Sequence, residues 1–497
     1  MASFVYYYKT PDDARHEGEI EAPDRDAAFA ALRARGIRAI KVEPKGWVTG
    51  KGYAGAGRRG LVAVALAVAA VAGVLAVLLG RRVTEDGLAE TVVVTEQGPV
   101  RLAPAAPLER QAIQGSRQRI EGAPTNLFAT AEEVYLSRFA EAAGRGAFGP
   151  QPIVILAGRN DLKGDYALKA VECGCNVLSD KPMAITPEVF AKTARAARLA
   201  EKKGLLFADI MTERNEITTI LQRELTFDRK LYGEQEKGTP EDPAVTKVSV
   251  HHFCKLVNGT PLKRPEWFYD VARQGEGIAD ITTHLVDMVQ WETFPGVRLQ
   301  TNDVRMISAR TWPTRITPEQ FKLSTGGAIA EPLDYRSNGE FTWALKGVHC
   351  KVSVTWAFMA PEGTGDTHYS LMLGTKAEVF IRQGKAEGYK PMLYVRSRAK
   401  DPGGIAGTER ALCETLKHLA PRFDGIGCCP AAGEPGAWRI LYSPKYDVGH
   451  EAHFSEVVRT FLGWMKRGKE DPLYVDNMLV KYHTIVEAWK LAHSEAE

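Results

Sequence analysis

Three polar residues between positions 274 and 291 are spaced so that they could share one face of a helix. Asp280, His284 and Asp287 occupy the i, i+4 and i+7 positions of the segment QGEGIADITTHLVDMVQW. Side chains at this spacing lie on the same side of an α-helix. A histidine beside a carboxylate can accept a proton near neutral pH. On spacing alone, an ordinary polar helix face is the more common explanation.

A lysine stands at the end of a predicted buried strand. The segment CNVLSDKP predicts a strand that ends at Asp180-Lys181-Pro182. In open α/β sheets, ligands bind at the carboxyl ends of the parallel strands. Lys181 is therefore a candidate for contacting a cofactor or polarising a hydroxyl. His251 and His252 lie in a later predicted strand, so one of them is expected to face a pocket wall; neither is assigned a catalytic role.

The elements around these residues predict two kinds of sheet. From 151 to 210 strands and helices alternate with short loops, which predicts a partial Rossmann-like parallel sheet of the α/β class. From 211 to 497 runs such as AVTKVSVHHF and HCKVSVTWAF alternate apolar and polar residues. This pattern predicts an α+β domain with a large, mainly antiparallel sheet covered on one face. Because few helices remain to cover the other face, we expect a homo-oligomer.

The chain before residue 83 predicts a membrane anchor. From Leu61 to Leu79 every residue is Leu, Val, Ala or Gly, with arginines on both sides. A run of this length nearly matches the hydrocarbon core of a bilayer, so residues 60–80 predict a single transmembrane helix. The excess of positive charge before the span mildly favours a cytoplasmic N-terminus. The side of the membrane on which the large domain lies is left open.

Residues 1–47 predict a small α+β module of two strands, a helix and a closing strand. Its GEIEA strand and RGI…VEP ending resemble the small N-terminal module of the platform proteins of type II secretion and type IV pilus systems. The resemblance implies a partner in a membrane complex. Residues 83–150, rich in proline and alanine at their start, predict a linker with partial structure and helices around 108–121 and 131–143.

The segments NVLSDKPMAIT and GEGIADITTHLVDMVQWETFPG together resemble the Gfo/Idh/MocA oxidoreductases. Segments including GTPEDPAVTKVSVHHF and GTGDTHYSLMLGTKA are similar to a subgroup with its own C-terminal domain, and the resemblance covers about 151–497. It implies hydride transfer between a carbohydrate-like alcohol or ketone and NAD or NADP. In this reading His284 exchanges the hydroxyl proton, Lys181 contacts cofactor and substrate, and Asp280 is the third catalytic residue. The implied cofactor-binding positions are Lys181, Pro182 and Asn160.

The chain departs from that family at its phosphate loop. Family members begin with a strand and a Gly- or His-rich loop, and residues 83–150 show no such loop. Gly55, Gly57 and Gly60 do form G-x-G-x-x-G, but no strand precedes them and a wholly apolar run follows. We therefore expect NAD(P) binding to be weak or lost. One alternative is a non-enzymatic, membrane-tethered binding or scaffold protein, or a truncated gene fusion. The other is an NAD-dependent glycosidase on the same fold.

Composition excludes other classes of function. The 64 basic and 61 acidic residues are interspersed and leave a net charge of +3, which predicts no nucleic-acid partner. The seven cysteines contain no paired C-x-x-C spacing, so no metal site is predicted.

Overall fold

The computed structural model describes residues 2–9, 15–22, 31–32, 35, 37, 39–44, 91–95, 98–102, 151–257 and 260–494. The chain divides into two compact units, Met1–Leu61 and Val62–Glu497, which are described separately. The predicted membrane span at 60–80 and the helices expected around 108–121 and 131–143 lie outside the described residues. Within the described ranges, no helix combines the length and the apolar character that crossing a membrane requires.

The first unit contains a small antiparallel sheet. Strand β1 (Ala2–Lys9) lies in the middle and pairs with β2 (Arg15–Ala22) on one side and with β3 (Ala39–Pro44) on the other. Ile20 and Leu32 are buried together against this sheet. The three strands predicted for this module are therefore present.

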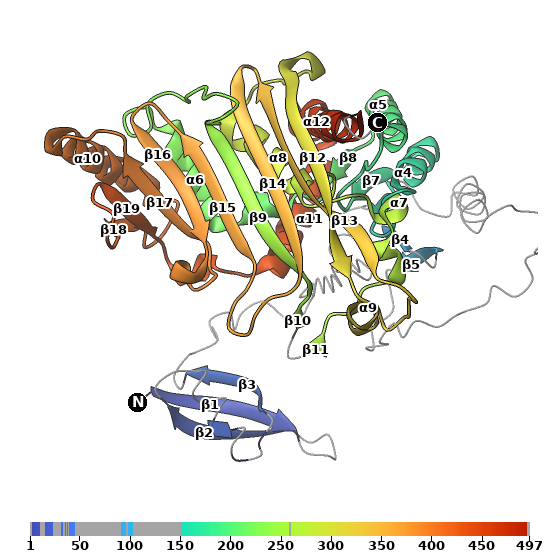
Figure 1. Ribbon diagram of the computed structural model, residues 1–497, viewed down its shortest axis with the longest axis horizontal. Helices are drawn as coiled ribbons and strands as arrows, with labels where there is room; N and C mark the ends of the chain where they lie inside the picture. Colours follow the sequence, from blue (N-terminus) through green and yellow to red (C-terminus); the bar gives the residue numbers. More distant parts are fainter. Residues whose placement is uncertain are drawn as a thin grey trace, which may run out of the picture. The chain divides into compact units, whose positions relative to one another are not determined.

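The parallel sheet predicted after residue 150 opens the second unit. Strands β6 (Ile153–Leu156), β7 (Asn176–Ser179) and β8 (Phe207–Asp209) pair in parallel, and helices α4 (Lys163–Glu172) and α5 (Pro187–Lys203) connect them (Figure 1). Every residue of the three strands is buried. This agrees with the rule that a parallel sheet is covered on both faces.

Helix α5 begins and ends where its sequence predicts. The side chain of Thr186 accepts a hydrogen bond from the Val189 amide, and Pro187 occupies the first turn. Gly204 ends the helix in the left-handed conformation, with φ 66°. These signals fix the length of the connection between β7 and β8.

Two strands precede residue 150 in the same sheet. Strand β4 (Thr91–Thr95) pairs in parallel with β6, and β5 (Gly98–Leu102) pairs antiparallel with β4, giving the order β5-β4-β6-β7-β8. Both strands lie within the range predicted as linker and partial structure. The segment TVVVT is rich in β-branched residues, which favour strands. The chain turns back into β5 within two residues, so no helix follows β4.

Helices cover both faces of the parallel sheet. Val154, Val177 and Phe207 pack in one core with residues of α4 and α5. Ile155 and Leu178, which point to the opposite face, pack in another core with α11 (His450–Arg467). Helix α11 therefore closes the side of the sheet that a second set of Rossmann helices would cover.

The large sheet has nine strands in the order β12-β13-β14-β9-β15-β16-β17-β19-β18. All neighbours are antiparallel except β9 and β14, so the predicted, mainly antiparallel sheet is present but mixed. Its strands are β9 (Val245–Cys254), β12 (Val304–Ile316), β13 (Leu333–Leu345), β14 (Val348–Met359), β15 (Thr367–Leu373), β16 (Ala377–Gln383), β17 (Met392–Ser397), β18 (Gly427–Pro430) and β19 (Ala437–Leu441).

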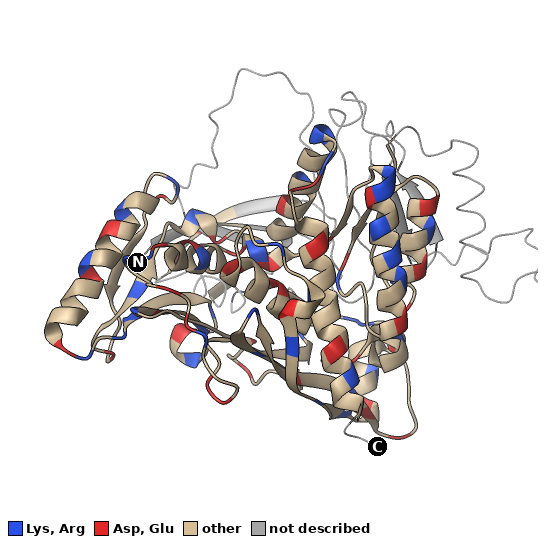
Figure 2. Ribbon diagram, turned by 90° about the horizontal axis from the view of Figure 1, so that it is seen from above, with Lys and Arg blue, Asp and Glu red and all other residues tan. Residues whose placement is uncertain are grey.

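Most helices of this part gather on one face of the large sheet (Figure 2). They are α6 (Ile217–Phe227), α7 (Val271–Gln274), α8 (Thr282–Thr293), α9 (Pro318–Thr325), α10 (Pro402–Leu419) and α12 (Tyr474–Ser494). The smaller elements are the pair β10 (Leu256–Val257) and β11 (Thr260–Pro261), and the short 3-10 helix η1 (Thr212–Asn215). Basic and acidic residues are interspersed along the helices in Figure 2.

A buried network of charges joins the two sheets through α8 and α12. The ammonium of Lys481 lies 2.7 Å from Asp209, at the end of β8, and 2.8 Å from Asp287 on α8. Arg214 binds the same Asp287 with two hydrogen bonds of 2.6 and 2.7 Å. Tyr482 donates to Asp209 at 2.8 Å. Because buried charges are tolerated only when they are paired and hydrogen-bonded, this network fixes how α8 sits on the parallel sheet.

Replacing Lys481 with methionine should destabilise the fold strongly. Two buried carboxylates would lose a shared counter-ion, which typically costs about 3–5 kcal/mol. The measurement is the free energy of unfolding from urea denaturation, with Lys490→Met as the control. Lys490 pairs with Glu487 on the exposed side of the same helix, and losing such a pair typically costs less than about 1 kcal/mol. Equal stability of the two variants would contradict the importance of the buried network.

Candidate functional site

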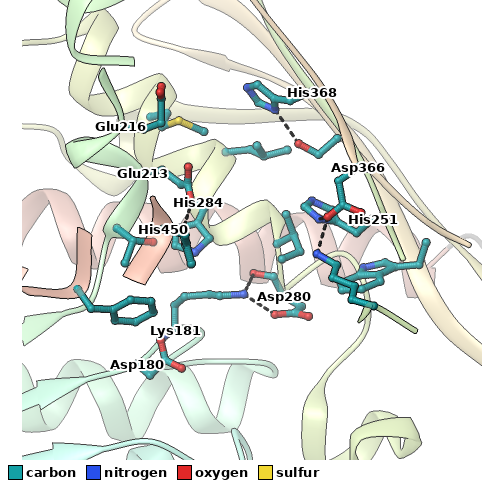
Figure 3. Close-up of a pocket in the computed structure, with 18 of the residues that line it drawn as sticks. Asp180, Lys181, Glu213, Glu216, His251, Asp280, His284, Asp366, His368 and His450 are labelled. Atoms are coloured by element: carbon teal, nitrogen blue, oxygen red, sulfur yellow. Dashed lines mark hydrogen bonds and ion pairs between the residues drawn. The ribbon is translucent and has the colours of Figure 1, made fainter. Parts of the chain in front are cut away.

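A cavity of about 550 Å³ lies between the parallel sheet and the large sheet. The loops that follow β6 and β7 line one side, and strands β9 and β15 and the segment before β15 line the other. Helix α8 and the N-terminus of α11 also contribute. Figure 3 shows polar side chains gathered around this space, among them Lys181, His251, His284 and Asp366. The cavity therefore lies where ligands bind in open α/β sheets.

Lys181 and Asp280 meet in this cavity. Lys181 follows β7, Asp280 precedes α8, and the ammonium lies 2.6 Å from the carboxylate (Figure 3). Burial alone would raise the pKa of Asp280, but the ammonium of Lys181 holds that pKa below its usual value. The structure thus brings together two of the predicted catalytic residues, 99 positions apart in the chain.

His284 lies in the first turns of α8 and lines the same cavity. Burial lowers the pKa of its imidazole well below the ordinary value, and the positive charge of Lys181 lowers it further. The Nδ1 atom of His284 is buried and has no hydrogen-bond partner among the described residues. A neutral imidazole with a buried, unpartnered nitrogen can accept or donate a proton to a bound molecule.

Asp287 does not share the site, and the predicted common face of three residues is wrong. Helix α8 begins at Thr282, so Asp280 lies in the turn before it. The carboxylate of Asp287 is bound by Arg214 and Lys481 instead of facing the cavity. The ammonium and guanidinium hold the pKa of Asp287 far below its usual range, although burial opposes them. Asp287 anchors the helix that carries His284.

The turn that positions Asp280 beside the cavity contains two glycines, Gly275 and Gly277. A Cβ at Gly277 would lie 1.8 Å from the carbonyl oxygen of Ser337 on β13, so only glycine allows this close approach. Gly275 has φ 92°, which other residues rarely adopt. Gly275 and Gly277 therefore hold Asp280 against the large sheet.

The two other predicted cofactor contacts are placed differently. Asn160 lines the cavity, but its side-chain amide is buried and donates to the carbonyl of Gln274 at 2.6 Å. It thus ties the loop after β6 to the segment that leads to Asp280. Pro182 is buried, its peptide bond with Lys181 is cis, and it is not among the residues that line the cavity. Of the predicted site residues, Lys181, Asp280, His284 and Asn160 share the cavity.

Lys163 is a site residue that the sequence analysis missed. Its ammonium, at the start of α4, donates to the carbonyls of Asp180 and Lys181 at 2.8 and 3.3 Å. Burial lowers the pKa of Lys163 to about 8. No local motif marks this lysine, because its two acceptors are backbone atoms of another strand end.

The wall formed by the large sheet carries a second polar cluster. Asp366 accepts from the Nδ1 atoms of His251 and His252 at 3.1 and 2.9 Å, and Lys255 lies 2.5 Å from it. His251 lines the cavity, as expected for one histidine of this pair. Its Nε2 atom is buried without a partner among the described residues. His368, next to this cluster, has a pKa lowered to about 3, chiefly by burial (Figure 3).

The cavity fits the reactive end of a nicotinamide dinucleotide better than its phosphates. Gly158, Asn160 and Lys181 follow β6 and β7, and could hold a nicotinamide and its ribose. The buried hydroxyl of Thr212, which also lines the cavity, has no partner among the described residues. A pyrophosphate is usually held by a glycine-rich turn and a helix N-terminus after the first strand. Here the parallel strand next to β6 is β4, which turns directly into β5.

The chain is similar to known oxidoreductases in sequence and in structure. Residues 221–493 match the family described as "Putative oxidoreductase C terminal domain". A solved structure of an oxidoreductase from Parabacteroides merdae ATCC 43184, whose function is unassigned beyond that class, is 42% identical. It aligns with a TM-score of 0.70 over 77% of this chain and 88% of that chain. The chain belongs to the Gfo/Idh/MocA-type oxidoreductases. The resemblance noted in the sequence is thereby confirmed.

Two other solved structures are less similar to this chain. An oxidoreductase from Erwinia carotovora atroseptica SCRI1043 is 16% identical, with a TM-score of 0.46 over 73% of this chain and 84% of that chain. A levoglucosan dehydrogenase solved with NADH and L-sorbose is 15% identical, with a TM-score of 0.46 over 69% and 78%. Residues 1–43 match the N-terminal domain of type II secretion system protein F, which confirms the second resemblance. No curated protein matches this Gfo/Idh/MocA-type chain.

The imidazole of His284 should remain neutral at pH 6. Because its folded-state pKa lies well below 6.5, the unfolded chain binds this proton more readily. Acidification below pH 6.5 should therefore lower the stability of the fold through His284, and this contribution should vanish above pH 6.5. Carbon-13 labelling of the histidine rings, with the signal assigned by loss in His284→Gln, gives the titration curve by NMR. A midpoint at or above pH 6.5 would contradict the buried, cation-facing environment.

Proposed function

We propose that this chain is an NAD(P)-dependent oxidoreductase that interconverts an alcohol and a ketone of a carbohydrate-like substrate. The observation that carries the proposal is the neutral His284, which lines the same cavity as the Lys181–Asp280 ion pair and whose buried Nδ1 has no partner among the described residues. Oxidation of an alcohol needs a base for the hydroxyl proton and a cation that stabilises the developing negative oxygen. The cavity holds both.

His284 acts in this proposal as the proton acceptor. The neutral ring takes the hydroxyl proton while the carbon–oxygen bond becomes a carbonyl, and it returns the proton in the reverse reaction. A bound nicotinamide would supply the hydride acceptor or donor, so that the hydrogen on carbon leaves with its electron pair. Because the Lys181 ammonium opposes a positive charge on His284, it favours rapid release of the proton.

Lys181 and Asp280 act as a pair. The ammonium of Lys181 can contact the substrate oxygen as that oxygen gains negative charge. Asp280 accepts two of the three ammonium hydrogens, through its carboxylate at 2.6 Å and its backbone carbonyl at 3.5 Å, and so orients the third. Lys163 donates hydrogen bonds to the backbone carbonyls of Asp180 and Lys181. These bonds keep the end of β7 beside the cavity.

Substitution of His284 or Lys181 should separate proton transfer from binding. His284→Ala should reduce kcat by about 10²–10⁴-fold, because the proton acceptor is removed. Lys181→Ala should lower kcat and also raise the KM for the cofactor. The measurement is the formation of NADH or NADPH with a panel of hexoses, hexitols and hexuronates. His349→Ala is a matched control, since His349 binds the carbonyls of Lys237 and Gly238 outside the cavity. Wild-type activity in His284→Ala would contradict the proposed role of His284 as the proton acceptor.

One observation favours a second candidate, a non-enzymatic binding protein. Strand β4 turns into β5 without a helix, so the described residues place no helix N-terminus beside the expected pyrophosphate position. Backbone hydrogen bonds to a charged group contribute about 1.5–3 kcal/mol each, and every 1.4 kcal/mol changes affinity about tenfold. Loss of two such bonds would leave a binding protein for sugars whose nucleotide site has decayed.

Isothermal titration of the full chain with NAD and NADP distinguishes the two candidates. The dehydrogenase proposal expects weak but measurable binding, with a Kd on the order of 0.1–1 mM. Lys181→Ala should weaken it further, while His349→Ala should not. Absence of binding at several millimolar would favour the non-enzymatic protein. A Kd in the low micromolar range would instead show that a phosphate site exists elsewhere in the chain.

We infer three further properties from the sequence. Residues 60–80 are proposed to anchor the chain in a membrane by a single span. Residues 1–47 are proposed to contact a partner in a membrane complex, since they match a secretion-system domain. The face of the large sheet away from the helices is proposed to mediate a homo-oligomer.

A further inference from the structure

Arg264 is a buried cation that lines the cavity without a counter-ion of its own. It is 4% exposed, and its Nε atom donates to the carbonyl of Phe253 at 2.8 Å. No carboxylate within the described ranges lies at ion-pair distance from the guanidinium. Charged side chains are almost never buried unless they are paired. The two terminal nitrogens of Arg264 therefore remain available for an acceptor in the cavity.

The carboxylates nearest to Arg264 are already bound to other cations. Asp280 is paired with Lys181 at 2.6 Å, and Asp366 is paired with Lys255 at 2.5 Å. Both raise the pKa of Arg264 through space, whereas burial lowers it, and burial prevails. Each lysine–aspartate pair is balanced, so this region of the cavity carries one surplus positive charge.

Aromatic rings account for only part of the environment of Arg264. The guanidinium lies 4.3 Å from the ring centroid of Phe268 and 5.6 Å from that of Trp356. A cation over a ring is attracted to its face. Such contacts satisfy no N–H group, because they leave the in-plane hydrogens of the fork without an acceptor. The rings instead hold the guanidinium in place and exclude water around it.

A second unsatisfied donor lies three residues further along the same segment. The indole Nε1 of Trp267 is buried, has no partner among the described residues, and belongs to a side chain that lines the cavity. An indole N–H can only donate. Two donors on one short segment of the cavity wall, one of them charged, call for a negatively charged acceptor.

We propose that the substrate of this site carries a carboxylate, which binds the fork of Arg264 and the indole N–H of Trp267. The substrate class is a polyhydroxy acid, such as a sugar acid of the hexuronate type. The inference rests on the proposed function, and narrows it from carbohydrate-like alcohols to their acids. Planar guanidinium groups match carboxylates with two parallel hydrogen bonds. A phosphate dianion fits less well, because it carries two negative charges. Arg264 supplies only one surplus positive charge beside Asp280 and Asp366.

Two further carboxylates of the cavity do not supply this charge. Glu213 and Glu216 lie at the opposite end from Asp366 (Figure 3), and burial raises the pKa of both. Thr218 and Thr219 donate to Glu216, and Glu213 lies 3.6 Å from His450. These contacts keep the two glutamates within their own cluster.

The test compares acids with matched neutral sugars on the full chain. D-glucuronate, D-galacturonate and D-mannuronate are each set against the corresponding hexose and hexose 6-phosphate. Both the rate with NAD or NADP and binding by isothermal titration are measured. We expect one hexuronate or more to exceed its hexose by about 30-fold or more in kcat/KM and in affinity. Arg264→Gln should abolish the difference, and Arg264→Lys should restore part of it. Arg310→Gln, on an exposed arginine, should leave it intact.

Each outcome bears on one proposal. Hexoses used or bound as well as hexuronates overturn the carboxylate site but leave the dehydrogenase standing, as does a preference for the phosphates. Hexuronate binding that depends on Arg264 without any turnover supports the carboxylate site while contradicting the dehydrogenase. Failure of every hexuronate to bind overturns the inference. The wild-type comparison needs no variant, so it remains decisive if Arg264→Gln does not fold.

Discussion

The buried ammonium of Lys481 is the contact on which the arrangement of the site depends. It is shared by Asp209, at the end of the parallel sheet, and by Asp287, on the helix that carries His284. Lys481 is the cation paired with buried Asp209, and it shares Asp287 with Arg214. A second buried pair, Lys247 with Glu292 at 2.6 Å, ties the same helix to the large sheet. Helix α8 is thus fixed at two points by fully desolvated charges, and the cavity exists because these points are rigid.

Within that frame, one ammonium lowers the pKa of both of its neighbours and so favours the deprotonated form of each. Lys181 favours the ionised form of Asp280 and disfavours the charged form of His284. Asp280 is thereby held as a carboxylate anion and His284 as a neutral imidazole, so the two groups take different roles beside one cation. In the proposed mechanism, the ammonium of Lys181 favours these two protonation states without a metal ion.

The sequence predicts the backbone of this site better than its side-chain partners. Buried β-branched strands and capped helices from 151 to 210 are local signals, and the structure confirms them. The Lys181–Asp280 pair follows from two motifs at strand and helix ends. Asp287 was misplaced, because spacing cannot reveal a lysine 194 residues away. The Lys255–Asp366 pair, 111 residues apart, and the carbonyl partners of Lys163 are also invisible to periodicity.

The position of Lys481 also bears on how the chain matures. It lies on α12, 194 residues downstream of Asp287, and ribosomes deliver about 5–20 residues per second. Asp209 and Asp287 therefore leave the ribosome roughly ten seconds or more before their counter-ion does. Asp287 can already pair with Arg214, but Asp209 has no counter-ion among the described residues until α12 emerges, so burying it before then is unfavourable. We therefore expect the parallel sheet and α8 to reach their final arrangement, and the cavity to close, only late in synthesis.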